Sequence, residues 1–357
     1  MKSIFLSFFF LSAILSSQTF ELKEKSLITY YESIIKAENN IVENNLLEAS
    51  KSYDIAFGLI NEPPAKDIYN SMQVSLKLQN SNVAFQKYNQ LKCLGYPFDE
   101  NFKNKNFKNF DFKVSECNVN FDKEYKKIID SLFEIDQKYR NLSNGDYSKF
   151  QKDITKSDSI TSTNLFKLIQ KKGFPNEYNI GVNTNGDISF QKFYFIIWHQ
   201  LVTNKYSKQQ VNFSEELNKA LNNGKILPEN AAFLYELSNN SNSFSSMHFN
   251  ILEFYKSNGS NITLREQVLN KTANIDCCYV HVWFFPEKRN EKAIEMVKKI
   301  NDNRKKIGLS DLDSELKKKV YYLKNQEYLF PRMGVLGETI EDTNKIEFLK
   351  KSLIKLQ

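Results

Sequence analysis

Residues 28–57 of the 357-residue chain read ITYYESIIKAENNIVENNLLEASKSYDIAF. Apolar side chains recur here at intervals of three and four, the spacing that places them on one face of an α-helix. Two such faces follow one another, the first made of Ile28, Tyr31, Ile34, Ile35 and Ile41 and the second of Leu46, Ala49, Tyr53, Ala56 and Phe57. We therefore expect two consecutive amphipathic helices.

The same pattern continues on both sides of this stretch and predicts four short helices between Leu22 and Gly95. Pro63-Pro64 separates the second helix from the third. The whole chain has only 11 Gly and 7 Pro, well below average usage, so tight turns are few. This scarcity argues against a β-sandwich, a barrel or a Gly-rich dinucleotide-binding fold and favours long helices.

The rest of the chain also reads as mostly helical. A periodic apolar face from Phe121 to Tyr139 opens a second region, and the apolar run from Phe193 to Leu201 predicts a buried helix. Gly173 and Gly308 are expected to end helices, and Pro228 to begin one. The one strand-like run is Cys278 to Phe285, dense in Tyr, Val, Trp and Phe. The expected fold class is therefore mainly α, with helical hairpins followed by a mostly helical domain that contains a minor strand element.

The expected organisation divides the chain into five parts. The segment 99–120 is rich in Asn, Lys and Phe and poor in Leu and Ile, so we place a linker there. The parts are a signal peptide at 1–17, a helical segment at 22–98, the linker, a helical domain at 121–345 and a C-terminal helix at 346–357.

The N-terminus has the pattern of a secretory signal peptide. Lys2 precedes the apolar run Ile4–Leu15, and Ser16 and Ser17 follow it. The run is shorter than the roughly 20 residues that a membrane-spanning helix needs. We therefore expect an exported protein that does not span a membrane. The net charge of +7 is spread among acidic residues. Even the run Lys317-Lys318-Lys319 follows three acidic residues, which indicates solvated helix faces and argues against nucleic acid as a partner.

Four cysteines in an exported chain suggest disulfides. Cys93 and Cys117 flank the linker and form the natural local pair. Cys277 and Cys278 are neighbours, and on a strand they would point to opposite faces. A bond between neighbours is strained, so each could instead remain free and buried.

Motifs of known chemistry are absent, because the sequence contains no HExxH, CxxC pair, phosphate loop or GxSxG. Asp276, Cys277, Cys278 and His281 are close in sequence, but a strand would divide them between two faces, too few on each for a zinc site. We therefore expect no metal and no cofactor. His199 lies in the apolar helix, where a satisfied core histidine and a catalytic base both fit the pattern. Asp136 and Arg140 are four apart, the spacing of an ordinary intrahelical ion pair.

The segment 22–98 resembles tetratricopeptide repeats. Ala49 and Tyr53 return as Ala84 and Tyr88 after 35 residues, close to the period of about 34 in that family. The resemblance covers two repeats, and a plain pair of helical hairpins explains the pattern almost as well. Stacked repeats of this kind offer a concave surface for a partner.

From about Phe121 to Lys319 the chain resembles an uncharacterised bacterial family of helical proteins, a domain of unknown function. The resemblance rests on the order of DQKYR at 136–140, LIQKKGFP at 168–175, Gly181, Trp198-His199, Gly224-Lys225-Ile226, Pro228 and NRKKIGL at 303–309. Gly173-Phe174-Pro175 stands where the family has Gly-Trp-Pro. The family's Tyr-Gly-Thr-Gln segment is replaced around Met247-His248-Phe249-Asn250. The resemblance implies no known reaction.

Two functions remain open from the sequence. The first is a non-enzymatic exported module that binds another protein or a peptide. The second is a hydrolase-like enzyme or small-molecule binder, in which Asp136, Arg140, His199 and Arg304 converge on a pocket. His199 would then act as the base and Asp136 as its orienting carboxylate, with Arg140, Gln200 and Arg304 as binding residues.

Overall fold

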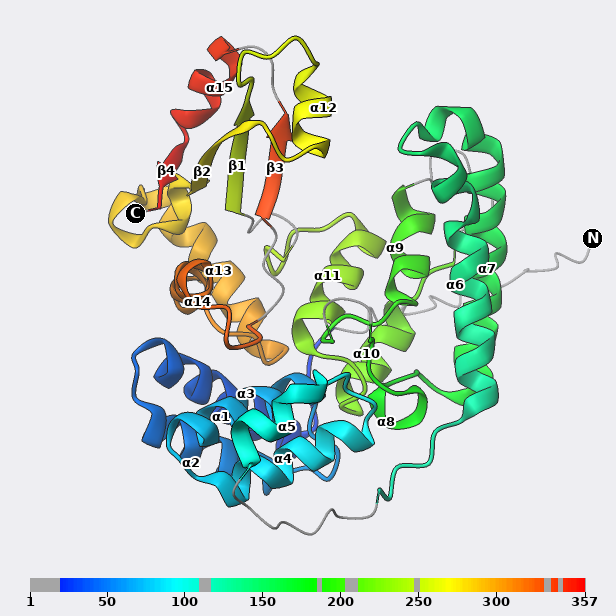
Figure 1. Cartoon of the computed structure of the whole chain (residues 1–357), viewed down its shortest axis with the longest axis vertical. Helices are drawn as coiled ribbons and strands as arrows, with labels where there is room; N and C mark the ends of the chain where they lie inside the picture. Colours follow the sequence, from blue (N-terminus) through cyan, green and yellow to red (C-terminus); the bar gives the residue numbers. More distant parts are fainter. Residues whose placement is uncertain are drawn as a thin grey trace, which may run out of the picture.

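The computed structural model describes residues 20–108, 117–184, 188–202, 211–246, 251–330, 335–339 and 343–356. The fold is mainly α, which confirms the predicted fold class. Three groups of elements are visible in Figure 1: an N-terminal helical array, a second group of helices that contains a long hairpin, and a small sheet. The expected signal peptide at 1–17 and the segment Met247–Asn250 lie outside the described residues.

The N-terminal array consists of two helical hairpins, and the four helices predicted between Leu22 and Gly95 are confirmed. Its helices are α1 (Lys25–Val42), α2 (Leu46–Phe57), α3 (Ala65–Lys77) and α4 (Ser81–Cys93). Ala49 and Ala84 are completely buried, and Tyr53 and Tyr88 are buried beside them. Because alanine leaves room for a neighbouring backbone, the small and large side chains at these matching positions let the paired helices approach closely.

The segment 99–120, expected as a linker, begins with a fifth helix, α5 (Glu100–Phe107). Phe107 is buried, and the rings of Phe102 and Phe107 pack against Tyr88 of α4. The aromatic side chains that interrupt this polar stretch therefore attach it to the array. A disulfide joins Cys93 to Cys117, with an S–S length of 2.02 Å and a Cα–Cα distance of 5.3 Å.

The second region opens with a long helical hairpin. The hairpin consists of α6 and α7, and the helices of the second region before the sheet are α6 (Lys123–Ser143), η1 (Tyr147–Phe150), α7 (Gln151–Lys172), α8 (Glu177–Ile180), α9 (Tyr194–Val202), α10 (Ser214–Asn222) and α11 (Pro228–Asn239). Asp122 accepts a hydrogen bond from the Tyr125 amide and caps α6. Gly173 follows the last residue of α7 with φ +84°, and Pro228 is the first residue of α11, so both signals act as predicted.

A four-stranded sheet follows, in the order β3-β1-β2-β4. The remaining elements are β1 (Ile251–Lys256), α12 (Leu264–Leu269), β2 (Asn274–His281), η2 (Val282–Phe284), η3 (Pro286–Lys288), α13 (Glu291–Lys306), α14 (Leu312–Lys324), β3 (Val335–Thr339), α15 (Thr343–Lys350) and β4 (Leu353–Lys355). β2 pairs antiparallel with β1 and β4, and β1 pairs parallel with β3.

The sheet corrects three expectations. The strand predicted at Cys278–Phe285 starts earlier and ends at His281, because its N-terminal half pairs with β1 while the residues after His281 turn into η2. The C-terminal helix expected at 346–357 ends at Lys350, since the chain then adds β4 to the sheet edge. Cys277 and Cys278, for which free thiols were an open alternative, are bonded to each other.

The largest hydrophobic core is shared by the array and the second region. One continuous cluster of buried side chains includes Tyr30, Tyr53, Leu165, Phe193 and Ile307. Gly308, the residue after the α13 C-cap, has φ +81°, and a Cβ there would lie 3.0 Å from Tyr31 of α1. Helices α13 and α14 lie between the sheet and the array (Figure 1). The second region is therefore built directly onto the array.

Candidate functional site

Three of the predicted site residues meet between α6, α7 and α9. Nδ1 of His199 lies 2.6 Å from Oδ2 of Asp136. Arg140 donates two hydrogen bonds to Asp158, at 2.7 and 2.8 Å. Asp136 and Asp158 are fully buried, and the His199 side chain is 17 % exposed. Helix geometry explains the meeting, because α6 presents residues 136 and 140 one turn apart on the face that packs against α7 and α9.

Each of the two carboxylates in this cluster has a different main partner. The guanidinium of Arg140 also donates to the carbonyl of Asp136, at 2.8 Å, and lies 3.6 Å from its Oδ1. One carboxylate thus orients the imidazole and the other holds the arginine in a forked pair. A carboxylate on Nδ1 fixes the tautomer and orientation that a histidine base requires. Arg140, however, binds an external anion only by giving up Asp158.

Arg304 does not join this cluster, so the expected convergence of four residues is wrong. Its buried guanidinium donates to the carbonyls of Ser310 and Phe244 and lies 3.5 Å from Glu315. The contacts with Ser310 and Glu315 fasten the turn between α13 and α14, and the bond to Phe244 joins α13 to the segment after α11.

Gln200 has a connecting role. Its amide donates to the carbonyl of Val211 at 2.9 Å and accepts from the amide of the same residue at 3.2 Å. The side chain thereby holds the end of α9 to the segment before α10. Gln200 is 2 % exposed, which leaves it little access to a ligand.

A buried network of charges joins the array to the second region. Glu38 of α1 contacts Lys318 of α14 at 2.5 Å and Lys66 of α3 at 3.0 Å. Lys66 also lies 3.3 Å from Glu229 of α11. Burial alone would raise the pKa of Glu38, but the two lysines outweigh it and lower that pKa below the usual value.

This network corrects the prediction that Lys317-Lys318-Lys319 is a solvated run, because Lys318 and Lys319 are buried. It also covers the side of α1 and α3 that faces α11 and α14. Sequence reasoning missed this network, as it missed Asp158. The nearest signal was the spacing of Lys319, which lies three residues after Leu316 and seven after Leu312 and so shares the buried face of α14.

A groove of about 830 Å³ lies between α1 and the turn from α13 to α14. Leu22, Ile28 and Ile35 supply an aliphatic side. Four carboxylates and two lysines line the remainder, giving a formal charge of −2, namely Glu21, Glu32, Asp302, Asp311, Lys305 and Lys306. The groove is thus negative in a chain whose net charge is +7.

Among the described residues, no group of three or more His, Cys, Asp or Glu side chains is arranged to hold a metal ion. None of the helices in that part of the chain is both long and apolar enough to cross a bilayer.

The chain was compared with family models, with curated proteins and with solved structures, and none of the three comparisons gave a match.

Proposed function

We propose that this protein is an exported helical module that binds a basic, partly apolar peptide segment in the groove between α1 and the α13–α14 turn. The observation that carries the proposal is the composition of that groove, an aliphatic side beside a net excess of carboxylates. Such a surface complements a segment that carries Lys or Arg next to apolar side chains. The proposal makes the protein a binding module with no catalytic role.

Three observations support the proposed export and the proposed relationships of the two parts of the chain. The charged, apolar and small-residue order of 1–17 supports export, to the periplasm or beyond. The ordered motifs between Phe121 and Lys319 support membership of the uncharacterised bacterial family named above, and the two hairpins α1–α2 and α3–α4 support kinship with tetratricopeptide repeats. The groove is formed where these two parts meet, so both contribute to it.

The test is selection of peptides by the full chain, followed by charge variants. A random peptide library displayed on phage is panned against the purified protein, and selected peptides are synthesised and their Kd values measured by fluorescence anisotropy. We expect the selected peptides to be basic. The double variant E32Q/D302N removes one carboxylate from each wall. It should weaken binding by about two- to thirtyfold, since two exposed ion pairs at about 0.2–1 kcal/mol each contribute about 0.4–2 kcal/mol.

The matched control is E134Q/E295Q, which removes two exposed carboxylates from α6 and α13 outside the groove. It changes the net charge by the same amount and should alter the Kd by less than about twofold. Selection of acidic peptides, selection of none, or equal weakening in both double variants would contradict the proposal.

A second candidate function is favoured by one observation, the hydrogen bond between His199 and Asp136. In this alternative the pair forms the acid–base site of a hydrolase-like enzyme or the polar centre of a small-molecule pocket. Turnover of chromogenic ester and phosphoester substrates tests it. An activity that is lost in both H199Q and D136N, with unchanged circular dichroism, would support the enzyme. Absence of any activity from the wild-type chain would favour the binding module.

A further inference from the structure

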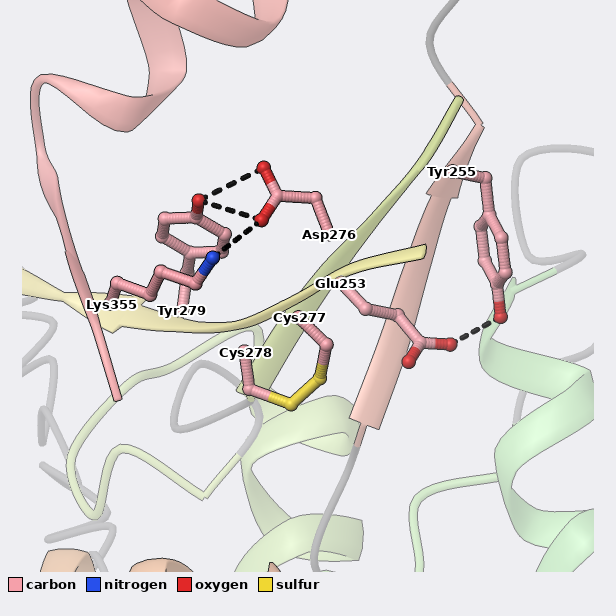
Figure 2. Close-up of a disulfide and its surroundings, with 7 residues drawn as sticks. All are labelled: Glu253, Tyr255, Asp276, Cys277, Cys278, Tyr279 and Lys355. Carbon is pink, nitrogen blue, oxygen red and sulfur yellow. Dashed lines mark hydrogen bonds and ion pairs between the residues drawn. A yellow bond between two sulfur atoms is a disulfide. The ribbon is translucent and has the colours of Figure 1, made fainter. Parts of the chain in front are cut away.

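The bond between Cys277 and Cys278 lies in the middle of the sheet, on a strand paired at both edges. Figure 2 shows the two sulfur atoms on one side of β2, with Glu253 of β1 beside Cys277. Both cysteines are partly exposed. The disulfide is therefore within reach of a small reductant in the folded protein.

Adjacency makes this bond chemically different from the other disulfide of the chain. Neighbouring Cα atoms are at most about 3.8 Å apart, whereas relaxed disulfides span about 4.4–6.8 Å, and a bond forced outside that range is more easily reduced. Cys93 and Cys117 meet the usual geometry with Cα atoms 5.3 Å apart. They also close a loop over 24 positions, so the bond and the fold stabilise each other. A bond between neighbours closes almost no loop, so its loss costs the fold little.

The bonded pair coincides with a bulge in β2. Leu252 of β1 lies opposite Tyr279, but the next residue, Glu253, lies opposite Cys277. Cys278 therefore has no partner in β1, which is the arrangement of a β-bulge. Its carbonyl accepts a hydrogen bond from Leu356, just beyond β4, at 2.8 Å.

The bulge changes which side chains share a face. In a regular strand, residues three apart point to opposite faces. Here the Tyr279 hydroxyl nevertheless reaches the Asp276 carboxylate, at 3.0 Å from each oxygen. Lys350 and Lys355 also contact this carboxylate, at 2.8 and 2.9 Å. Figure 2 shows Asp276, Tyr279 and Lys355 gathered on the side of β2 away from the sulfur atoms. Together these contacts tie α15 and β4 to the sheet.

We propose that Cys277–Cys278 is a redox-active pair, reduced in the folded protein by a dithiol, and that its reduction releases the bulge in β2. A thiolate of the reductant attacks one sulfur, the Cys277–Cys278 bond breaks, and the other sulfur leaves with the electron pair and takes up a proton. The second thiol of the reductant then displaces the protein sulfur and closes its own disulfide. The protein gains two electrons and two protons, which the dithiol loses.

The structural consequence is confined to the sheet. Without the bond, Cys278 can pair with a residue of β1. The side chains of β2 after Cys278 then each move to the opposite face of the sheet. Tyr279 then leaves the face of Asp276, so the attachment of α15 and β4 weakens. The array, held by the core that it shares with the second region and by Cys93–Cys117, should not respond.

The test uses the purified, oxidised chain and graded concentrations of dithiothreitol. Free thiols are trapped with N-ethylmaleimide, and both pairs are quantified by peptide mass spectrometry, so Cys93–Cys117 is an internal control. We expect Cys277 and Cys278 to be labelled at dithiothreitol concentrations at least about tenfold lower. At a dithiothreitol concentration that reduces only Cys277–Cys278, hydrogen exchange should rise in β1, β2, β4 and α15 and stay unchanged in α1–α4.

A variant provides the second measurement. C277S/C278S should show the same rise in exchange in the sheet without any reductant, and if it does not fold, the wild-type titration still decides. Free thiols at 277 and 278 in the unreduced protein would overturn the proposal. So would reduction of both pairs over the same concentration range, or unchanged exchange in the sheet after selective reduction.

Discussion

Replacing Lys318 by methionine tests whether the buried charge network holds the array to the second region. Lys318 is 1 % exposed, and its ammonium contacts Glu38 at 2.5 Å and the Ser310 hydroxyl at 3.3 Å. Methionine keeps most of the volume but leaves Glu38 buried with Lys66 as its remaining cation, at 3.0 Å. Removing one partner of a buried pair costs about 3–5 kcal/mol, and the retained Lys66 places the expected loss near the lower end, about 3 kcal/mol.

The assay is urea unfolding followed by circular dichroism at neutral pH. Lys317, the exposed neighbour on α14, provides the control, because K317M makes the same chemical change in solvent and should stay within about 0.5 kcal/mol of the wild type. The double variant E38Q/K318M removes the charge that K318M leaves buried. It should recover part of the loss. Equal midpoints and slopes for K318M and K317M would refute the reasoning.

Three further predictions concern groups elsewhere in the fold. Burial raises the pKa of Asp67 from 3.8 to about 6, so the folded state holds its proton more tightly than the unfolded state, and stability falls as pH rises from about 4 to about 6. Urea unfolding at several pH values should show this decline. The total loss of unfolding free energy over this pH range should be up to about 3 kcal/mol larger in the wild type than in D67N. G308A should cost about 2 kcal/mol or more, because φ is +81° and the new Cβ meets a tyrosine ring at 3.0 Å. G95A, at φ +86° with open space around it, should cost only about 1 kcal/mol in the same thermal unfolding series, and equal losses would contradict the steric argument. C93S/C117S should lose about 3–4 kcal/mol in guanidinium unfolding, and a loss below 1 kcal/mol would show that the loop entropy is not the main effect.

What could be predicted from the sequence is the part of the fold that depends on local spacing. The faces of α1 and α2 and the stop at Gly308 follow from residues near one another in the chain. Asp136 and Arg140 were predicted as an intrahelical pair, and the meeting with His199 was a hypothesis that the structure supports with a 2.6 Å contact.

What could not be predicted depends on partners far away in the chain. Lys318 looks like one of three surface lysines until Glu38, 280 positions earlier, is placed beside it. The strands that pair with β2 were missed for the same reason. β1 is six residues long, and its apolar and polar residues alternate only weakly. Its parallel neighbour β3 comes more than 70 residues later, so neither strand shows its pairing in its own sequence. The bulge at Cys278 is set by register across two strands, which spacing along one strand does not contain.

The order β3-β1-β2-β4 has a consequence for how the protein is made. Both edge strands come from the last part of the chain, while the central hairpin β1–β2 is synthesised much earlier. Until residues 335–355 have emerged, both edges of that hairpin are open to pairing with another chain. A premature stop between Phe330 and Val335 would leave the helical array and its core complete yet produce a protein with two unpaired strand edges. The C-terminal segment therefore acts as the chain's final protection against aggregation during biosynthesis.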